Sequence, residues 1–210
     1  MKGTIATVPV HRFEDGCSTP GQDFVAVEEP FQIRLDDRDL VLTMRTPGHD
    51  RDLAAGFLFT EGLLQRPDQI ANIQEDGYGT ITITLAPGVE INWDSLARNS
   101  YLTSSCGVCG KASIDALRIA GCRSLPAGVP LVDAASLHHL PNELRRMQTI
   151  FERTGGSPAD GPFDAAGTVL STRENAGRHN ADGAPAGLTC SQNPTHRTNH
   201  GHMWRGTKRA

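Results

Sequence analysis

The chain has 210 residues, of which 38% are hydrophobic and 5% aromatic, and its formal net charge is −4. This length suffices for one sizeable core, or for one domain with a small annex. The weakly acidic balance provides no basic field, so it gives no case for nucleic acid or an anionic membrane as a main partner. No signal peptide or membrane span stands out, and an odd number of cysteines argues against a disulfide framework. We therefore expect a cytoplasmic protein with free, metal-bound or reactive thiols.

The N-terminal half has the pattern of a β-rich structure. Residues 1–22 are rich in polar residues, Gly and Pro, and we expect them to form a loose N-terminal segment. Alternation over residues 24–46 predicts a hairpin whose turn runs from Asp36 to Asp39. A helix capped by Asp50 is expected next, and Pro67 is expected to end it. Further strands are predicted over residues 69–74, 80–85 and 89–93.

The C-terminal half begins with a cysteine-containing loop and a helix that is expected to end at Gly121. A second helix is predicted over residues 141–151, with Pro141 in its first turn and Gly155 stopping it. A short hairpin is predicted over residues 163–174. Residues 181–210 have few large apolar side chains and no periodicity, so we expect this tail to be disordered.

The chemical motif of the chain is Cys106-Gly-Val-Cys109, preceded by two serines and followed by Gly110-Lys111. Thiolate is the reactive form of cysteine, and both a helix N-terminus and a nearby ammonium group stabilise it. The two glycines leave room for a ligand to approach the backbone. The motif therefore suits a nucleophilic or sulfur-carrying thiol at Cys106.

Three other interpretations of this motif each lack a feature that they require. A structural zinc site needs two further ligands, but Cys17 and Cys122 are isolated and no second Cys-x-x-Cys occurs. A thioredoxin-like redox pair would follow a strand directly, and the residues before Cys106 are poor strand formers. A zinc deaminase would carry His-x-Glu and then Pro-Cys-x-x-Cys, whereas Ser105 precedes Cys106 and no His-x-Glu lies upstream. We therefore expect no metal site, and histidines of the tail do not change this expectation.

Four blocks of the sequence, in this order, resemble the formate dehydrogenase accessory protein family, FdhD. They are Arg45 to Leu64 (RTPGHDRDLAAGFLFTEGLL), Ser104 to Arg118 (SSCGVCGKASIDALR), Phe151 with Thr154-Gly155-Gly156, and Arg173-Glu174 with Gly177-Arg178-His179-Asn180. Four ordered blocks are far more specific than one Cys-x-x-Cys pair.

The resemblance implies a sulfurtransferase. Such proteins pass sulfane sulfur from a cysteine desulfurase to a molybdenum (or tungsten) bis-pterin guanine dinucleotide cofactor, which formate dehydrogenase needs for activity. The family's persulfide-carrying cysteine aligns with Cys106, and its second loop cysteine with Cys109. The expected partners are the desulfurase, formate dehydrogenase as client and a second copy in a homodimer, while no tightly bound cofactor is expected.

Two further groups of polar residues are candidates for contacting the acceptor cofactor. Arg178, His179 and Asn180 could meet its phosphate or pterin groups, since Arg suits bidentate phosphate contacts, or they could form a polar turn. His49 at a helix start could face a ligand, although a polar residue in this place is more often structural.

The resemblance also implies an α+β or α/β fold with an N-terminal addition. A β-rich part with one helix would span residues 23–100, and an incomplete cytidine-deaminase-like domain with the cysteine loop would span residues 101–180. The family pattern is broken over Ser157–Pro162, at Asn175-Ala176 and after Asn180. A shifted reading frame would explain these departures. The alternative function is a truncated, non-catalytic remnant that retains only donor binding or dimerisation.

Overall fold

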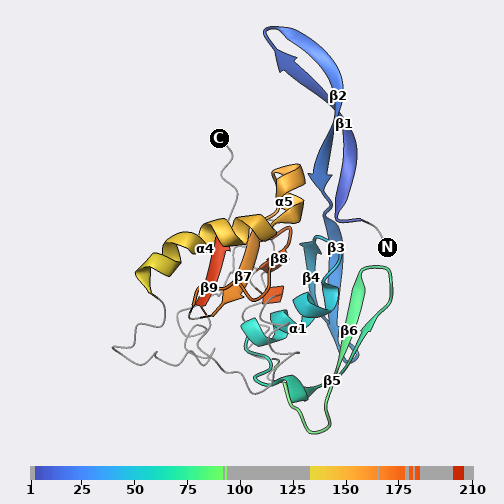
Figure 1. Cartoon of the computed structure of the whole chain (residues 1–210). Coiled ribbons are helices and arrows are strands. Elements are labelled where there is room, and N and C mark those ends of the chain that lie inside the picture. Colours follow the sequence, from blue (N-terminus) through green and yellow to red (C-terminus); the bar gives the residue numbers. More distant parts are fainter. Residues whose placement is uncertain are drawn as a thin grey trace.

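The computed structural model describes residues 3–91, 93, 133–164, 166–177, 180, 181, 183 and 184, and the backbone of residues 201–205 (Figure 1). Strands dominate its N-terminal part, and helices pack beside strands in its C-terminal part. The predicted mixture of helices and strands with a β-rich N-terminal part is therefore confirmed. The helix expected to end at Gly121 lies outside the described residues.

The first element is a two-stranded hairpin that projects from the rest of the molecule (Figure 1). Its strands are β1 (Ile5–Glu14) and β2 (Cys17–Ala26), paired antiparallel with Glu14 opposite Cys17. The turn is Asp15-Gly16, with positive φ at both residues (51° and 78°), which is the geometry of a tight two-residue hairpin turn. The expectation of a loose segment over residues 1–22 is therefore wrong, because the Asp15-Gly16 turn pairs two strands of ten residues each.

The second sheet has the strand order β4-β3-β6-β5. Strands β3 (Glu29–Leu35) and β4 (Arg38–Arg45) form the predicted hairpin, and Asp36 in its turn has a φ of 52°. Strands β5 (Ile70–Glu75) and β6 (Thr80–Leu85) confirm two more predicted strands, and β6 runs parallel to β3. The strand expected over residues 89–93 is absent from the described part of that range.

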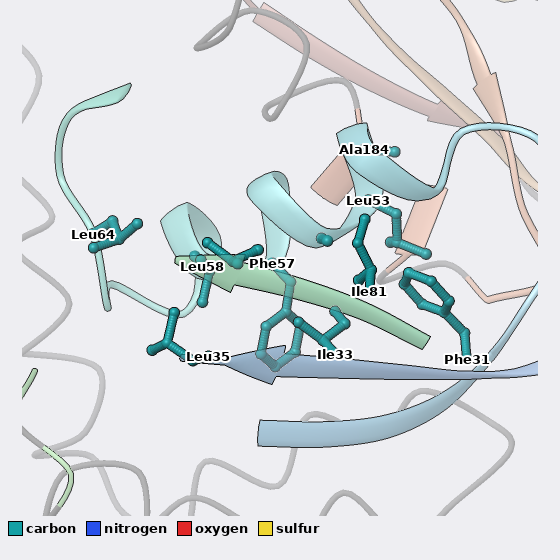
Figure 2. Close-up of a cluster of buried hydrophobic side chains, with 11 residues drawn as sticks. Phe31, Ile33, Leu35, Leu53, Phe57, Leu58, Leu64, Ile81 and Ala184 are labelled. Carbon is teal, nitrogen blue, oxygen red and sulfur yellow. The ribbon is translucent and has the colours of Figure 1, made fainter. Parts of the chain in front are cut away.

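One face of this sheet is covered by helix α1 (Asp50–Thr60) (Figure 1). Alternate residues of β3 and β6 pack against the buried face of α1. Side chains recur on one face every two residues in a strand and about every 3.6 residues in a helix, and these two faces together form the core. Figure 2 shows these side chains between the helix and the strands. The core includes Phe31, Ile33, Leu35, Leu53, Phe57, Leu58, Leu64, Ile81 and Ile83.

The ends of α1 differ from the prediction. His49, and not Asp50, occupies the N-cap position, because the Asp50 carboxylate is bonded to Arg45 instead of to the helix amides. The helix ends at Thr60, well before Pro67, which opens a short 3-10 helix, η1 (Pro67–Gln69). Leu64 is still buried, but as part of the connecting segment.

The C-terminal part combines two helices with a small sheet of order β8-β7-β9. Helix α4 (Ala134–Met147) starts earlier than expected and contains Pro141 in its interior, and α5 (Thr149–Thr154) follows it. Gly155 stops α5, as predicted, and it has the left-handed conformation. Strands β7 (Ala159–Phe163) and β8 (Arg173–Glu174) pair antiparallel, so the predicted hairpin exists but starts four residues earlier.

Part of the segment after Asn180 is ordered in the structure. Ala181 and Ala184 are fully buried, and Ala184 belongs to the core cluster that α1 forms with the second sheet. Strand β9 (Gly201–Arg205) pairs antiparallel with β7. For these residues the expected disorder is wrong, because small side chains can fill a close contact, and strand pairing uses the backbone. Gly183 is also buried, and residues 182, 185–200 and 206–210 lie outside the description.

Candidate functional site

The cysteine pair that was predicted to carry sulfur, Cys106 and Cys109, lies outside the described residues, as do Arg178 and His179. Cys17 is the one cysteine within the described ranges, and it is exposed near the tip of the β1–β2 hairpin. Within those same ranges no group of three or more His, Cys, Asp or Glu side chains could hold a metal ion. No described helix combines the length and the apolar character that crossing a bilayer requires.

The structure brings together the first and last of the four motif blocks at the start of α1. At the centre is Arg45, the last residue of β4, whose side chain is only 5% exposed. Its Nε and Nη2 donate to the two carboxylate oxygens of Asp50 at 2.9 and 2.8 Å. Its Nη1 donates to Oε2 of Glu29 at 3.1 Å. A buried cation with two carboxylate partners fixes the turn between β4 and α1.

This ion-pair arrangement explains the electrostatics of Arg45. Burial lowers the pKa of the guanidinium, but hydrogen bonds and charges from Asp50 and Glu29 outweigh burial, so the pKa of Arg45 is raised. Arg45 therefore stays charged at every physiological pH. The sequence carried a signal for this role. Arg45 lies on the core-facing side of β4, as Val41 and Thr43 do. A charged side chain that points toward the core is unfavourable unless a group of opposite charge pairs with it.

A second ion pair joins α1 to the C-terminal sheet. The Nε and Nη2 atoms of Arg173 on β8 donate to Oδ2 of Asp52 at 3.0 and 2.8 Å. His49 lies beside this pair, with Nδ1 at 3.9 Å from the same Asp52 oxygen, and about half of its side chain is exposed. Partial burial, and then the positive charge of Arg173, lower the pKa of His49. His49 is therefore mainly neutral at pH 7 and able to donate or accept a hydrogen bond at the surface.

The two residues that follow Arg173 also anchor other elements. Both oxygens of the Glu174 carboxylate accept backbone N–H groups at the start of α5, from Ile150 and Phe151, at 2.8 Å each. Oδ1 of Asn175 accepts the backbone N–H of Thr46 at 3.2 Å. Sequence reasoning missed these roles, since each connects positions far apart in the chain.

Asn180 is the one described member of the three cofactor-binding candidates. It is 6% exposed, and its Nδ2 donates to the carbonyl oxygen of Met44 at 2.7 Å and to Oγ1 of Thr43 at 3.3 Å. The amide nitrogen is thus occupied in holding the chain against β4. A contact of Asn180 with a cofactor stays a prediction.

The motif blocks that meet at the start of α1 lie within the match to one known family. The model of the FdhD/NarQ family matches residues 26–193, which include both ion pairs and both loop cysteines. The chain belongs to the FdhD/NarQ family. The match continues past Asn180 to residue 193, further than the sequence blocks indicated.

Relatives in this family are similar over most of the chain. Sulfur carrier protein FdhD of Streptomyces avermitilis is 42% identical over 182 residues, which are 82% of this chain and 64% of the relative. The protein of the same name from Mycobacterium tuberculosis is 41% identical over 170 residues, which are 75% of this chain and 61% of the relative. The chain thus spans slightly more than three fifths of the length of these relatives.

A solved structure is similar in fold. The crystal structure of a protein from Desulfotalea psychrophila, named as a formate dehydrogenase accessory protein, superimposes with a TM-score of 0.66 at 18% identity. The similarity covers 97% of this chain and 73% of that one. At this level of identity it supports the fold.

Proposed function

We propose that the chain is a cytoplasmic sulfur carrier in which Cys106 holds sulfane sulfur as a persulfide. The observation that carries the proposal is that Cys106 and Cys109 lie within the family match, in a chain 42% identical to a protein named as a sulfur carrier. The name of the relatives supports sulfur carriage, and the name of the solved structure supports a role in aid of formate dehydrogenase. The donor and the acceptor belong to the proposal.

The loading step is a thiolate exchange. The Cys106 thiolate attacks the terminal sulfur of a persulfide on a cysteine desulfurase. The sulfur–sulfur bond of the donor breaks, its electron pair leaves on the donor cysteine as thiolate, and a new sulfur–sulfur bond forms on Cys106. The sulfane sulfur changes carrier, so the step needs no external oxidant or reductant.

In the release step the acceptor is the molybdenum bis-pterin guanine dinucleotide cofactor, which is the substrate here. We propose that Cys109 assists by holding the persulfide or by attacking Cys106 Sγ. The second route expels hydrosulfide and leaves a Cys106–Cys109 disulfide, which a thiol reductant must then open. Arg178, His179 and Asn180 are the proposed contacts to the cofactor, whose phosphates suit an arginine.

The test of this function is sulfur loading. The full chain is incubated with a cysteine desulfurase and cysteine, and peptide mass spectrometry locates the added sulfur. We expect one sulfur chiefly on Cys106, none there in Cys106→Ala, and partial loading with impaired transfer in Cys109→Ala. Sulfur mainly on Cys109, or spread equally over all cysteines, would contradict the assignment.

A second candidate is a protein that accepts sulfur without delivering it. The observation that favours it is Ser157, within the segment that departs from the family pattern. This residue has a φ of 93°, which is strained for a side chain other than glycine, and its buried Oγ lacks a hydrogen-bond partner among the described residues. Complementation of cells that lack the accessory protein separates the candidates: restored formate dehydrogenase activity requires delivery as well as loading.

A further inference from the structure

Two buried asparagines from the C-terminal part bind the backbone at the end of β4, an edge strand of the second sheet. Oδ1 of Asn175 accepts the N–H of Thr46, which follows β4 directly, at 3.2 Å. Nδ2 of Asn180 donates to the carbonyl oxygen of Met44 at 2.7 Å. Asn175 is 3% exposed and Asn180 6%. Two buried amide side chains therefore fasten the same short stretch of chain to one strand end.

The two asparagines use opposite ends of the amide group. The oxygen of Asn175 also accepts the N–H of Ala176 at 2.8 Å. The nitrogen of Asn180 also donates to Oγ1 of Thr43 at 3.3 Å. An ionised carboxylate accepts hydrogen bonds but donates none, so it can replace the amide at position 175 and not at position 180.

The stretch of chain between the two asparagines is held at both ends. The N–H of Asn175 donates to the carbonyl oxygen of Pro158 at 3.1 Å, which adds a backbone bond to its side-chain bonds. The N–H of Ala181 donates to the carbonyl oxygen of Gly177 at 2.8 Å, which closes the chain into a turn at Asn180. A buried amide is costly unless its hydrogen bonds are made, so these contacts favour one position of the stretch over others.

This stretch matters because of two residues within it. Arg178 and His179, which are proposed contacts to the acceptor, lie outside the described residues, but Gly177 and Asn180 on either side of them are described and bonded. A binding segment that is fixed before its ligand arrives loses less conformational entropy on binding and therefore binds more tightly. Such preorganisation depends on further residues that hold the contacting ones in place.

We propose that Asn175 and Asn180 are positioning residues of the acceptor site, which hold residues 176–179 against the end of β4 in the arrangement that binds the nucleotide ends of the acceptor. The inference rests on the proposed function for the identity of the acceptor. Asn175 is not one of the proposed contacts, so its effect on the acceptor comes through the position of the segment.

Calorimetric titration of the full chain with guanosine diphosphate, as a probe for the nucleotide ends of the acceptor, tests the proposal. The variants are Asn175→Ala, Asn175→Asp and Asn180→Asp. The two aspartate variants add the same charge at the two ends of one segment, so a difference between them reports on hydrogen bonding. Ile83→Val, in the core position of β6, is the control for a modest loss of stability. Urea unfolding of each variant checks the fold.

We expect Asn175→Ala and Asn180→Asp to weaken the Kd for guanosine diphosphate by roughly tenfold. Asn175→Asp should stay within about threefold of wild type, because its carboxylate still accepts both N–H groups. Ile83→Val should leave the Kd unchanged. Wild-type affinity in Asn175→Ala, equal weakening in the two aspartate variants, or a loss in Ile83→Val as large as in Asn175→Ala would overturn the proposal.

Sulfur loading of Cys106, measured in the same preparations, separates this inference from the proposed function. Loading should be the same in wild type and in all variants. A wild-type chain that loads sulfur but does not bind guanosine diphosphate would overturn the inference and leave sulfur carriage standing. The expected pattern of Kd values without any loading would support the positioning role and contradict sulfur carriage.

Discussion

Arg45 and Arg173 show how single charged residues organise this protein. Each lies at an end of a strand, and each binds an aspartate in the first turn of α1, at Asp50 and Asp52 respectively. A buried or half-buried charge costs free energy unless it is paired, so each arginine specifies which strand end meets the helix. In the sequence, Arg45 stands at a core-facing position of a predicted strand. The sequence pattern does not indicate that Arg173 makes the corresponding contact with Asp52.

Replacing Arg45 by Met should destabilise the fold by about 3 kcal/mol. The loss arises because Asp50 and Glu29, whose side chains are 18% and 21% exposed, would lose the cation that compensates their partial burial. Arg45→Lys should cost less, because the charge remains while the bidentate contact with Asp50 is lost. Urea unfolding measures these differences. Arg66→Met is the control, since the Arg66–Asp68 pair is largely exposed and should change stability by less than about 0.5 kcal/mol.

His49 should make stability depend on pH in the mildly acidic range. The pKa of His49 is lowered by burial and by Arg173, so the unfolded chain binds a proton more readily than the folded one. The free energy of unfolding should therefore fall as the pH drops below about 6.5, the ordinary pKa of histidine, and be unaffected by this group at higher pH.

The measurement is urea unfolding at pH 7.5 and pH 5.5, roughly one unit on either side of that ordinary value. His49→Asn should reduce the pH dependence. Arg173→Gln should lower stability at both pH values yet also flatten the dependence, because it removes a nearby positive charge. If the free energy of unfolding falls by the same amount between pH 7.5 and pH 5.5 in wild type and in His49→Asn, His49 is not the source of the pH dependence.

At the scale of elements, local signals predict the strands of the second sheet well and the ends of helices poorly. The β3–β4 hairpin, β5 and β6 follow from alternation and β-branched residues, which are visible in a few neighbouring positions. Asp50 has the sequence pattern of an N-cap residue, but its carboxylate binds Arg45, and His49 takes the N-cap position of α1. The β1–β2 hairpin was missed although Asp15-Gly16 is a strong turn signal.

That hairpin also shows how an isolated pair of strands avoids aggregation. The N–H of Val27 donates to the carbonyl of Thr4, so these two opposite residues form a hydrogen-bonded pair. Hydrogen-bonded and non-hydrogen-bonded pairs alternate along an antiparallel ladder. The Pro9–Gln22 and His11–Pro20 pairs are therefore non-hydrogen-bonded, and their backbone N–H and C=O groups point away from the partner strand. Each open edge therefore carries a proline, which has no N–H for an added strand.

Helix α5 should depend on Glu174, which caps it from another element. Its carboxylate accepts two backbone N–H groups at the helix start, where negative charge is also favoured by the helix dipole. Glu174→Ala should cost about 1 to 2 kcal/mol, and Glu174→Gln somewhat less, because the amide oxygen can still accept one bond. Hydrogen exchange of α5 amides measures the local effect. In Glu143→Gln, which alters an exposed pair with Arg146, these amides should exchange as in wild type.

At the scale of the whole molecule, contacts remote in sequence join the N-terminal and C-terminal sheets. Thr46 binds Asn175, Asp52 binds Arg173, and Met44 binds Asn180. Ala184 belongs to the core cluster that α1 forms with the second sheet (Figure 2). Such contacts are difficult to predict from one sequence, because each joins residues more than a hundred positions apart and no local pattern marks them. The four ordered motif blocks identified the family, but the contacts explain why the first and last of them belong together.

The last prediction is that the two sheets lose protection together when the core under α1 is weakened. Leu58 is fully buried between α1 and the second sheet, and Leu58→Ala should cost about 3 kcal/mol by leaving a cavity. Because α1 is bonded to β8 through Asp52 and Arg173, loosening the helix should also loosen β7 (Ala159–Phe163). Native-state hydrogen exchange should therefore show faster exchange in β6 and β7 alike. Leu170→Ala is the control, since Leu170 is half exposed and should leave both strands protected. Faster exchange confined to β6 would mean that the sheets are independent units, and the ion pair between α1 and β8 would then carry no coupling between them.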